Sequence, residues 1–197
     1  MKTIGQRLYF TLGSVLLCLI LGMGFTLWLE RHDANQAATA TKRNAQIGMG
    51  VRQMRLEMYQ MSDAMRGMLL DPKNEKERQR KLAADENFDK AVDGVKNLLT
   101  DNPDLVGLLE KAGDFDTKVL NPEEEKVCSL LTTNAAAALE IYEKSYLGLR
   151  QQQMAILDEF ADKAEKLSEQ EVSRAETARN VGLGIIGGVI LLAILIG

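Results

Sequence analysis

The sequence predicts an all-α protein, an antiparallel up-down four-helix bundle whose first and last helices are continuous with transmembrane helices. Two observations support this fold class. Apolar runs bracket the chain, from Leu8 to Leu29 and from Val181 to Ile196. The residues between the runs are polar and rich in helix formers, and their apolar side chains recur at alternating steps of three and four, which is the spacing of one face of a packed helix.

The two apolar runs differ in length. A helix needs about 20 residues to cross the hydrocarbon core of a bilayer, and the first run, residues 8–29, is long enough. The second span, residues 181–197, is shorter and lacks the Lys or Arg that usually marks the far side of a crossing helix. We therefore expect residues 181–197 to be a second transmembrane helix that is truncated at Gly197.

The charges beside the first run predict the orientation. Lys2 and Arg7 favour a cytoplasmic location for residues 1–7, so residues 30–180 form one extracytoplasmic domain. A cleaved signal peptide is the alternative, because Ala38-Thr39-Ala40 has the pattern of a cleavage site. We expect an uncleaved anchor, because the apolar run exceeds the roughly 7 to 15 residues of a signal-peptide core.

Composition limits the classes of molecule that the chain is expected to bind and the type of core it can form. The chain is 46% hydrophobic and 5% aromatic and has a net charge of -4, so it lacks the basic balance of a nucleic-acid-binding protein. Few aromatic residues predict a core of Leu, Ala, Val and Met. Cys18 lies in the first apolar run and Cys128 in the extracytoplasmic domain, so we expect no intrachain disulfide.

One long helix is predicted from the membrane to about Leu70, because Asp71-Pro72 ends it. A second helix is predicted before Asn102-Pro103. We expect the methionines of the first helix to be core residues rather than metal or haem ligands. The apolar seams of these two helices are Ile47, Val51, Met54, Met58, Met61, Met65 and Met68, and then Phe88, Val92, Val95 and Leu99.

The second half of the bundle is less clearly marked. Residues 103–120 are expected to be a weaker connecting segment, with a short helix near the membrane as the alternative. Asn121-Pro122 with the acids after it predicts the start of the next helix. The turn into the last helix is expected near residues 145–148. The apolar positions assigned to these two helices are Val127, Leu131, Ala138 and Ile141, with Asn134 on the same seam, and then Leu157, Phe160, Ala164 and Leu167.

No catalytic or cofactor-binding motif is recognisable. His32 is the single histidine, and there is no Cys-x-x-Cys-His, no glycine-rich phosphate loop and no credible Ser, His and Asp set. We expect no enzymatic activity, no metal and no cofactor. The acidic run Glu123-Glu124-Glu125 is expected to be a solvated face, so Glu124→Lys should change stability by about half a kcal/mol or less. Met61→Asp should instead bury a carboxylate without a partner, at a cost of several kcal/mol.

The order of these elements resembles the extracytoplasmic four-helix-bundle sensor region of bacterial methyl-accepting chemotaxis proteins and sensor histidine kinases, in the chemoreceptor-type or CHASE-type bundles. The residues that carry the resemblance are the basic start, the corner Met65-Arg66-Gly67-Met68-Leu69-Leu70-Asp71-Pro72, the stop before Asn102-Pro103, and a last helix unbroken into the second span. The resemblance implies a homodimer in the bacterial inner membrane. It would also begin the third helix at Pro103.

Arginines on the first helix are the candidate ligand-binding residues, because a guanidinium holds a carboxylate or phosphate through two parallel hydrogen bonds. In the resembling receptors, arginines of this helix at the dimer interface bind the ligand, and a cysteine at Ser62 is expected to cross-link two chains. Pairing of these arginines with nearby acids on a wet surface is the alternative. The candidate residues are Arg52, Arg55, Tyr59, Ser62 and Arg66, with Arg150 completing the site from the last helix.

The sequence thus predicts a ligand-sensing transmembrane receptor region that passes a helix displacement to a cytoplasmic module. Its expected partner is a small-molecule ligand, for which an anion would suit the arginines, or a periplasmic binding protein. The cytoplasmic signalling module that we expect first is that of a methyl-accepting chemotaxis protein. A histidine kinase sensor and a non-sensing, oligomerising membrane bundle are the alternatives.

Overall fold

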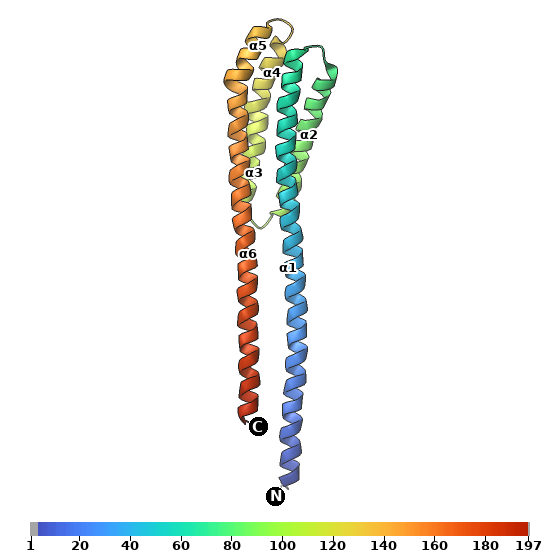
Figure 1. The fold of residues 1–197 in the computed structure, drawn as a ribbon, viewed down its shortest axis with the longest axis vertical. Coiled ribbons are helices and arrows are strands. Elements are labelled where there is room, and N and C mark those ends of the chain that lie inside the picture. The colour runs from blue at the N-terminus through green and yellow to red at the C-terminus, as the bar shows by residue number, and fades with distance from the viewer. Residues whose placement is uncertain (1–3, 197) are drawn as a thin grey trace. The chain divides into compact units, whose positions relative to one another are not determined.

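The computed structural model describes residues 4–196, and every regular element among them is helical, with no strand. The chain is therefore all-α, as predicted. Figure 1 shows the helices. Their bounds are α1 Ile4–Leu70, α2 Glu75–Leu98, α3 Pro103–Phe115, the π-helix η1 Asp116–Leu120, α4 Asn121–Leu130, α5 Ala135–Ile141, the π-helix η2 Tyr142–Tyr146, and α6 Leu147–Ile196.

The chain divides into two compact units, residues 1–42 with 168–197, and residues 43–167. The predicted spans belong to the first unit. Some side chains of the first unit lie outside the described part of the structure. They are those of residues 1–12, 14, 15, 18, 19, 29, 30 and 33 near the start, and those of residues 175, 178, 179, 185, 186 and 189–197 near the end. Among the residues that were described, no helical segment is both long and apolar enough to cross a membrane.

Two predicted helix ends are confirmed. α1 ends at Leu70, directly before Asp71-Pro72, and the Asp71 side chain accepts a hydrogen bond from the Lys73 N–H at 3.1 Å. α2 ends at Leu98, and Pro103 occupies the first turn of α3. Proline is favourable there because the first N–H groups of a helix have no intrahelical acceptor.

Residues 103–120 differ from the prediction. They form helix α3 and the π-helix η1 rather than a weak connecting segment, which matches the helix start at Pro103 that the resemblance implied. The predicted helix start at Asn121-Pro122 coincides with the first residues of α4, which follows η1 without a break. The Asn121 N–H donates to the carbonyl of Asp116, five residues back, as in a π-helical turn. The next residue, Pro122, has no backbone N–H to donate.

The predicted turn near residues 145–148 is wrong. That segment is helical, as the end of η2 and the start of α6, and the chain turns instead at residues 131–134. The N–H of Asn134 donates to the carbonyl of Leu130 at 2.8 Å, and the Asn134 side chain accepts from the Ala137 N–H at 3.2 Å. Asn134 is therefore the N-cap of α5 and not a member of a continuous seam.

Two apolar clusters fill the interior of residues 43–167. The first joins α1 to α2, α3 and α6, and the second joins the end of α1 to η1, α4, α5 and η2. The predicted core is confirmed at the following buried positions: Ile47, Val51, Met54, Met58, Met61, Met65, Met68, Phe88, Val92, Val95, Leu99, Val127, Leu131, Ala138, Leu157 and Phe160. Ile141, Ala164 and Leu167 are half-buried.

Candidate functional site

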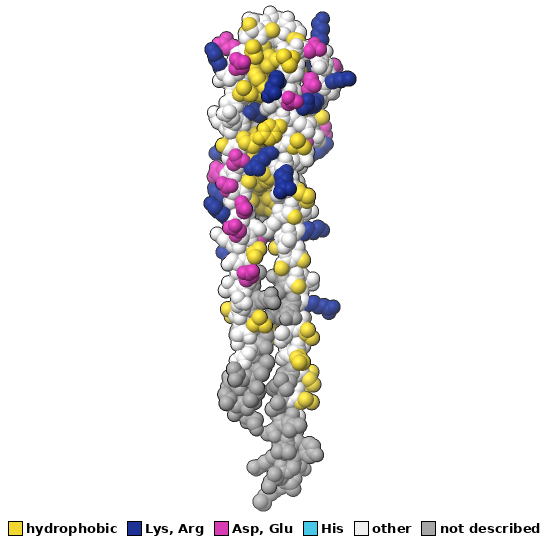
Figure 2. Space-filling view, viewed as in Figure 1, with side chains coloured by type: hydrophobic (Ala, Val, Ile, Leu, Met, Phe, Trp, Pro, Cys, Tyr) yellow, Lys and Arg dark blue, Asp and Glu magenta, His cyan; other side chains and the backbone are white. Residues whose placement is uncertain are grey.

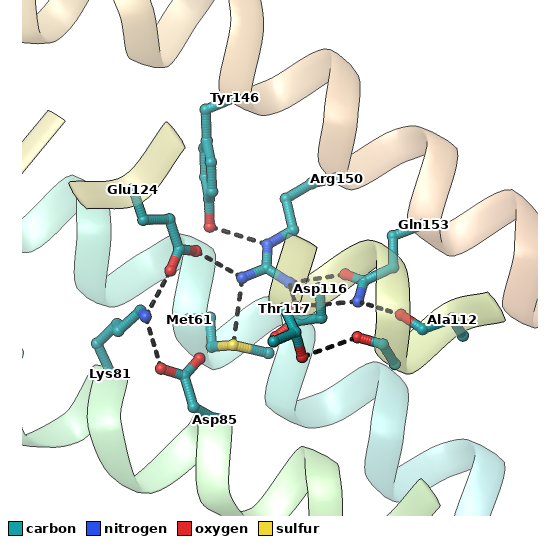
Figure 3. A network of polar contacts seen from close by, with 11 residues as sticks. Met61, Lys81, Asp85, Ala112, Asp116, Thr117, Glu124, Tyr146, Arg150 and Gln153 are labelled. Atoms are coloured by element: carbon teal, nitrogen blue, oxygen red, sulfur yellow. Dashed lines mark hydrogen bonds and ion pairs between the residues drawn. The ribbon is translucent and has the colours of Figure 1, made fainter. Parts of the chain in front are cut away.

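A layer of polar and charged side chains lies at the junction of the two apolar clusters (Figure 3). Met61 belongs to the first cluster and Met65, one turn further along α1, to the second. The layer consists of Lys81 and Asp85 from α2, Asp116 from η1, Glu124 from α4, Tyr146 from η2, and Arg150 and Gln153 from α6. We call it the buried charge layer.

Arg150 is the centre of the layer and is only 5% exposed. Its Nε donates to the Tyr146 hydroxyl at 2.9 Å, and Nη1 donates to Asp116 Oδ1 at 2.8 Å and to Gln153 Oε1 at 2.7 Å. Nη2 donates to Glu124 Oε1 at 2.6 Å and to Met61 Sδ at 3.2 Å. A guanidinium has five N–H donors, so every donor of Arg150 has an acceptor.

Gln153 fixes the position of Asp116. The Gln153 amide nitrogen donates to Asp116 Oδ1 at 3.0 Å and to the carbonyl of Ala112 at 3.3 Å. Asp116 is the first residue of η1 and is 3% exposed. A π-helical turn inserts an extra residue into an α-helix, and such turns are frequent at functional sites. η1 and η2 each supply one member of the layer, Asp116 and Tyr146.

Lys81 joins α2 to the layer. Its ammonium lies 2.5 Å from Glu124 Oε2 and 2.5 Å from Asp85 Oδ2. Glu124 therefore has a cation on each oxygen, Arg150 on Oε1 and Lys81 on Oε2. The other oxygen of Asp85, Oδ1, is buried and has no hydrogen-bond partner.

Burial and neighbouring charges shift the pKa values of four groups. Burial raises the pKa of Asp85 to about 6, opposed by Lys81 and assisted by Glu124 and Asp116. Burial also raises the pKa of the Tyr146 hydroxyl. For Arg150, burial alone would lower the pKa, but Tyr146, Glu124 and Asp116 outweigh it and the net direction is upward. Lys81 behaves likewise, because Glu124 and Asp85 outweigh burial and raise its pKa.

The layer can therefore hold ionised side chains at the centre of the helices. It ties α2, η1, α4, η2 and α6 together through directional bonds, and removing one partner of a buried ion pair costs about 3–5 kcal/mol. Among the described residues, no group of three His, Cys, Asp or Glu side chains could hold a metal ion.

The structure separates the residues predicted to bind ligand. Arg52, Tyr59 and Arg66 are exposed, and Tyr59 is 64% exposed. Arg55 instead turns toward α6, where Nη2 lies 2.6 Å from Asp158 Oδ1. Pairing with acids, the alternative reading of these arginines, applies to Arg55 and to Arg66, whose guanidinium lies 3.8 Å from Asp63.

Ser62 and Arg150 do not lie on the exposed line. The Ser62 carbonyl accepts a hydrogen bond from the Tyr142 hydroxyl at 3.4 Å. Ser62 therefore packs against η2 within its own chain, so it is a poor position for cross-linking two chains. Arg150 reaches Met61 on the buried seam of α1 and cannot complete a site with the exposed arginines.

A surface groove adjoins Arg66 at the end of α1. It has a volume of about 470 Å³ and lies between the last turns of α1 and the start of α5 with η2. Charged Arg66 and Glu143 line it together with Leu69, Leu70, Ala135, Ala136, Leu139 and Tyr142. Arg66 is thus a predicted ligand-binding residue that the structure places beside a groove.

Comparison with known proteins gives no match: neither a protein-family model, nor a curated protein, nor a solved structure matches this chain.

Sequence reasoning missed most of the buried charge layer and misread Glu124. That residue is 2% exposed, so it does not belong to a solvated face. The sequence does contain a signal for this layer. Arg150 and Gln153 precede Leu157 and Phe160 at steps of three and four, so they lie on the same helix face as these core residues. Polar residues at core positions of a heptad pattern indicate a buried polar layer.

Proposed function

We propose that this chain is the sensory part of a two-pass receptor in a bacterial inner membrane. Residues 43–167 would be an antiparallel up-down four-helix bundle outside the cytoplasm. α1 and α6 would continue into transmembrane helices through the apolar runs at residues 8–29 and 181–196. The proposal is supported by the helix bounds, since α1 and α6 each include an apolar run without an interruption in the described residues.

The observation that carries the proposal is a second heptad seam on α1, exposed to solvent. Met49, Leu56, Asp63 and Leu70 each follow a buried seam residue by two positions, which is about 200° around a helix. Leu70 is 83% exposed and Met49 59% exposed. We call this set the outer seam, and its members at steps of three and four are Met49, Arg52, Leu56, Tyr59, Asp63, Arg66 and Leu70.

A second copy of the same helix is the proposed partner of the outer seam. Residues at alternating steps of three and four form the contact faces of coiled coils. The apolar members of the outer seam are Met49, Leu56, Tyr59 and Leu70. Figure 2 shows hydrophobic side chains interspersed with Lys, Arg, Asp and Glu side chains on the visible face of residues 43–167. A homodimer through α1 would cover the outer seam, and it is the arrangement of the receptors that the sequence resembles.

The dimer would create two candidate anion sites, one at each of two arginine pairs that lie about 21 Å apart along α1. In a parallel two-fold pair, each residue near the axis faces its own copy, so Arg52 would face Arg52 and Arg66 would face Arg66. Like charges brought together in this way repel, and a carboxylate or phosphate between them relieves the repulsion. A small anionic ligand at the dimer interface is therefore the proposed stimulus, and a periplasmic binding protein is the alternative partner.

Transmission would be mechanical. A ligand shifts an equilibrium only by its differential affinity for the two states, and the states proposed here differ in the position of α6 relative to α1. A displacement of about 1–2 Å along a continuous helix is a known type of switching motion. The output module would be that of a methyl-accepting chemotaxis protein, with a histidine kinase as the alternative.

Disulfide cross-linking tests the outer seam. In a background with Cys18→Ser and Cys128→Ser, Tyr59→Cys should form a disulfide-linked dimer rapidly in membranes, because residue 59 lies on the proposed two-fold axis. Lys90→Cys is the matched control, because Lys90 is exposed on α2, away from the seam. Equal rates at both positions, or a monomeric Tyr59→Cys protein, would contradict the dimer.

The candidate anion sites have their own readout. We expect at least one compound in a set of small carboxylates and phosphates to change the cross-linking rate of Tyr59→Cys. Adding both Arg52→Ala and Arg66→Ala to the same protein should abolish that change. Dimerisation without any such response across the set would favour the structural, oligomerising bundle over a receptor.

A further inference from the structure

We propose that the buried charge layer is a proton-binding site, in which Asp85 of α2 takes up one proton at mildly acid pH and thereby tightens the packing of α2 on α4 and η1. This inference goes beyond the proposed receptor and does not depend on the dimer or on its ligand. It concerns a group that the predicted ligand site does not use.

The charge count of the layer is the first argument. Its acids are Asp85, Asp116 and Glu124, and its bases are Lys81 and Arg150. With all five groups ionised, the layer has one negative charge in excess, and Lys81 and Asp85, with side chains 14% and 20% exposed, lie at its edge. An uncompensated buried charge is costly, and a titratable group usually takes up a proton instead.

The pairing pattern identifies the acid that is least stabilised as an anion. Arg150 binds both Asp116 and Glu124 directly. Asp85 has only Lys81, and it shares that ammonium with Glu124 at the same distance of 2.5 Å. Because Asp85 Oδ1 is buried without a hydrogen-bond partner, one oxygen is free to carry a proton.

Among the groups around Asp85, the acids favour protonation and the ammonium of Lys81 opposes it. α4 contributes Glu124 and η1 contributes Asp116, both of which disfavour a second anion. On α2 itself, Asp89 lies one turn from Asp85, and burial, Asp116 and Asp93 raise the pKa of Asp89 as well. α6 contributes Arg150, which donates to Glu124 and to the hydroxyl of Tyr146 from η2. α1 contributes the uncharged Met61, and the buried acid Glu57 lies one turn before it.

The direction of the pH effect follows from the pKa of Asp85, which rises from 3.8 to about 6 on folding. Between these two values the folded chain binds more protons at this site than the unfolded chain. Stability from this site is therefore present below pH 4 and is lost as the pH rises through about 6. A protonated Asp85 would leave Lys81 to Glu124 alone and would remove the repulsion between two carboxylates.

The test compares the melting temperature of the full chain in detergent with that of Asp85→Asn from pH 4.5 to pH 8. Asparagine has the shape of aspartate but cannot ionise. We expect Asp85→Asn to melt above the wild type at pH 7.5, and we expect this difference to shrink toward zero below pH 5. Asp93→Asn, an exposed aspartate two turns further along α2, is the control and should show no pH-dependent difference.

A direct titration keeps the proposal testable if Asp85→Asn folds poorly. The carboxyl carbon resonance of Asp85, assigned by its loss in the variant or by selective labelling, should titrate near pH 6. A midpoint for Asp85 at or below 4, or a pH-independent difference in melting temperature, would overturn the proposal. Neither outcome would bear on cross-linking through the outer seam.

Discussion

The guanidinium of Arg150 lies 3.2 Å from the sulfur of Met61, so the methionine seam of α1 has a cation at its side. The expectation that Met61 lies on an apolar seam is correct, since the residue is fully buried. The expectation that a polar group at this position would find no partner is wrong, because one N–H of Arg150 has only a thioether as its acceptor. A sulfur accepts hydrogen bonds weakly.

Met61→Gln should therefore be milder than Met58→Gln. The two methionines are buried to the same degree, and both variants place a carboxamide in the core. At position 61 the carbonyl oxygen can accept from Arg150, whereas at position 58 the first apolar cluster surrounds the amide. An unsatisfied buried amide costs roughly 1–3 kcal/mol, so we expect a gap of that size in the free energy of unfolding, measured by denaturant titration. Equal losses would show that Arg150 does not reach residue 61 in solution.

Glu124 and Glu125 are adjacent in the sequence but differ in their surroundings. Glu124 is buried between Arg150 and Lys81, and Glu125 is exposed. Glu124→Lys would put three cations together and leave Arg150 and Lys81 without their shared anion, so we expect a loss of about 3–5 kcal/mol or failure to fold. Glu125→Lys should stay within about 0.5 kcal/mol of the wild type. If thermal melts show small effects for both, the buried charge layer is not formed.

Gly48 and Gly50 offer a matched pair on one helix. A Cβ at Gly50 would collide with the Val95 side chain of α2, whereas a Cβ at Gly48 would meet nothing within 4 Å. Alanine in an open helical position stabilises by roughly 0.5–1 kcal/mol relative to glycine. We therefore expect Gly48→Ala to raise the melting temperature and Gly50→Ala to lower it, because α1 and α2 would have to separate. A rise in both variants would mean that α2 does not approach α1 closely there.

The core seams and two of the helix ends were predictable from the sequence because their signals are local. Apolar spacing depends on the period of the helix alone, and Asp71-Pro72 ends α1 through the conformational limits of the residue before proline. The turn at residues 131–134 contains neither glycine nor proline. Only the N-cap Asn134 marks it, and the apolar pattern continues across it.

The buried charge layer was harder to predict for a different reason. A charged residue at a core position is stable only if its partners come from other helices, and those partners are 26 residues away for Glu124 and 34 for Asp116. The π-helical turns also shift the register at Asp116 and Tyr146. A pattern with a constant helical period cannot anticipate such a shift, so only Arg150 was singled out beforehand.

The central claim is that residues 43–167 lie outside the cytoplasm on two membrane-spanning helices. Labelling of single cysteines with a membrane-impermeant maleimide in intact cells of a suitable bacterial host tests it, in the background with Cys18→Ser and Cys128→Ser. Thr133 is exposed in the turn between α4 and α5, so Thr133→Cys should be labelled in intact cells. Thr3→Cys should be labelled only after the membrane is permeabilised. Protection of residue 133 in intact cells, or labelling of both positions, would contradict the proposed topology.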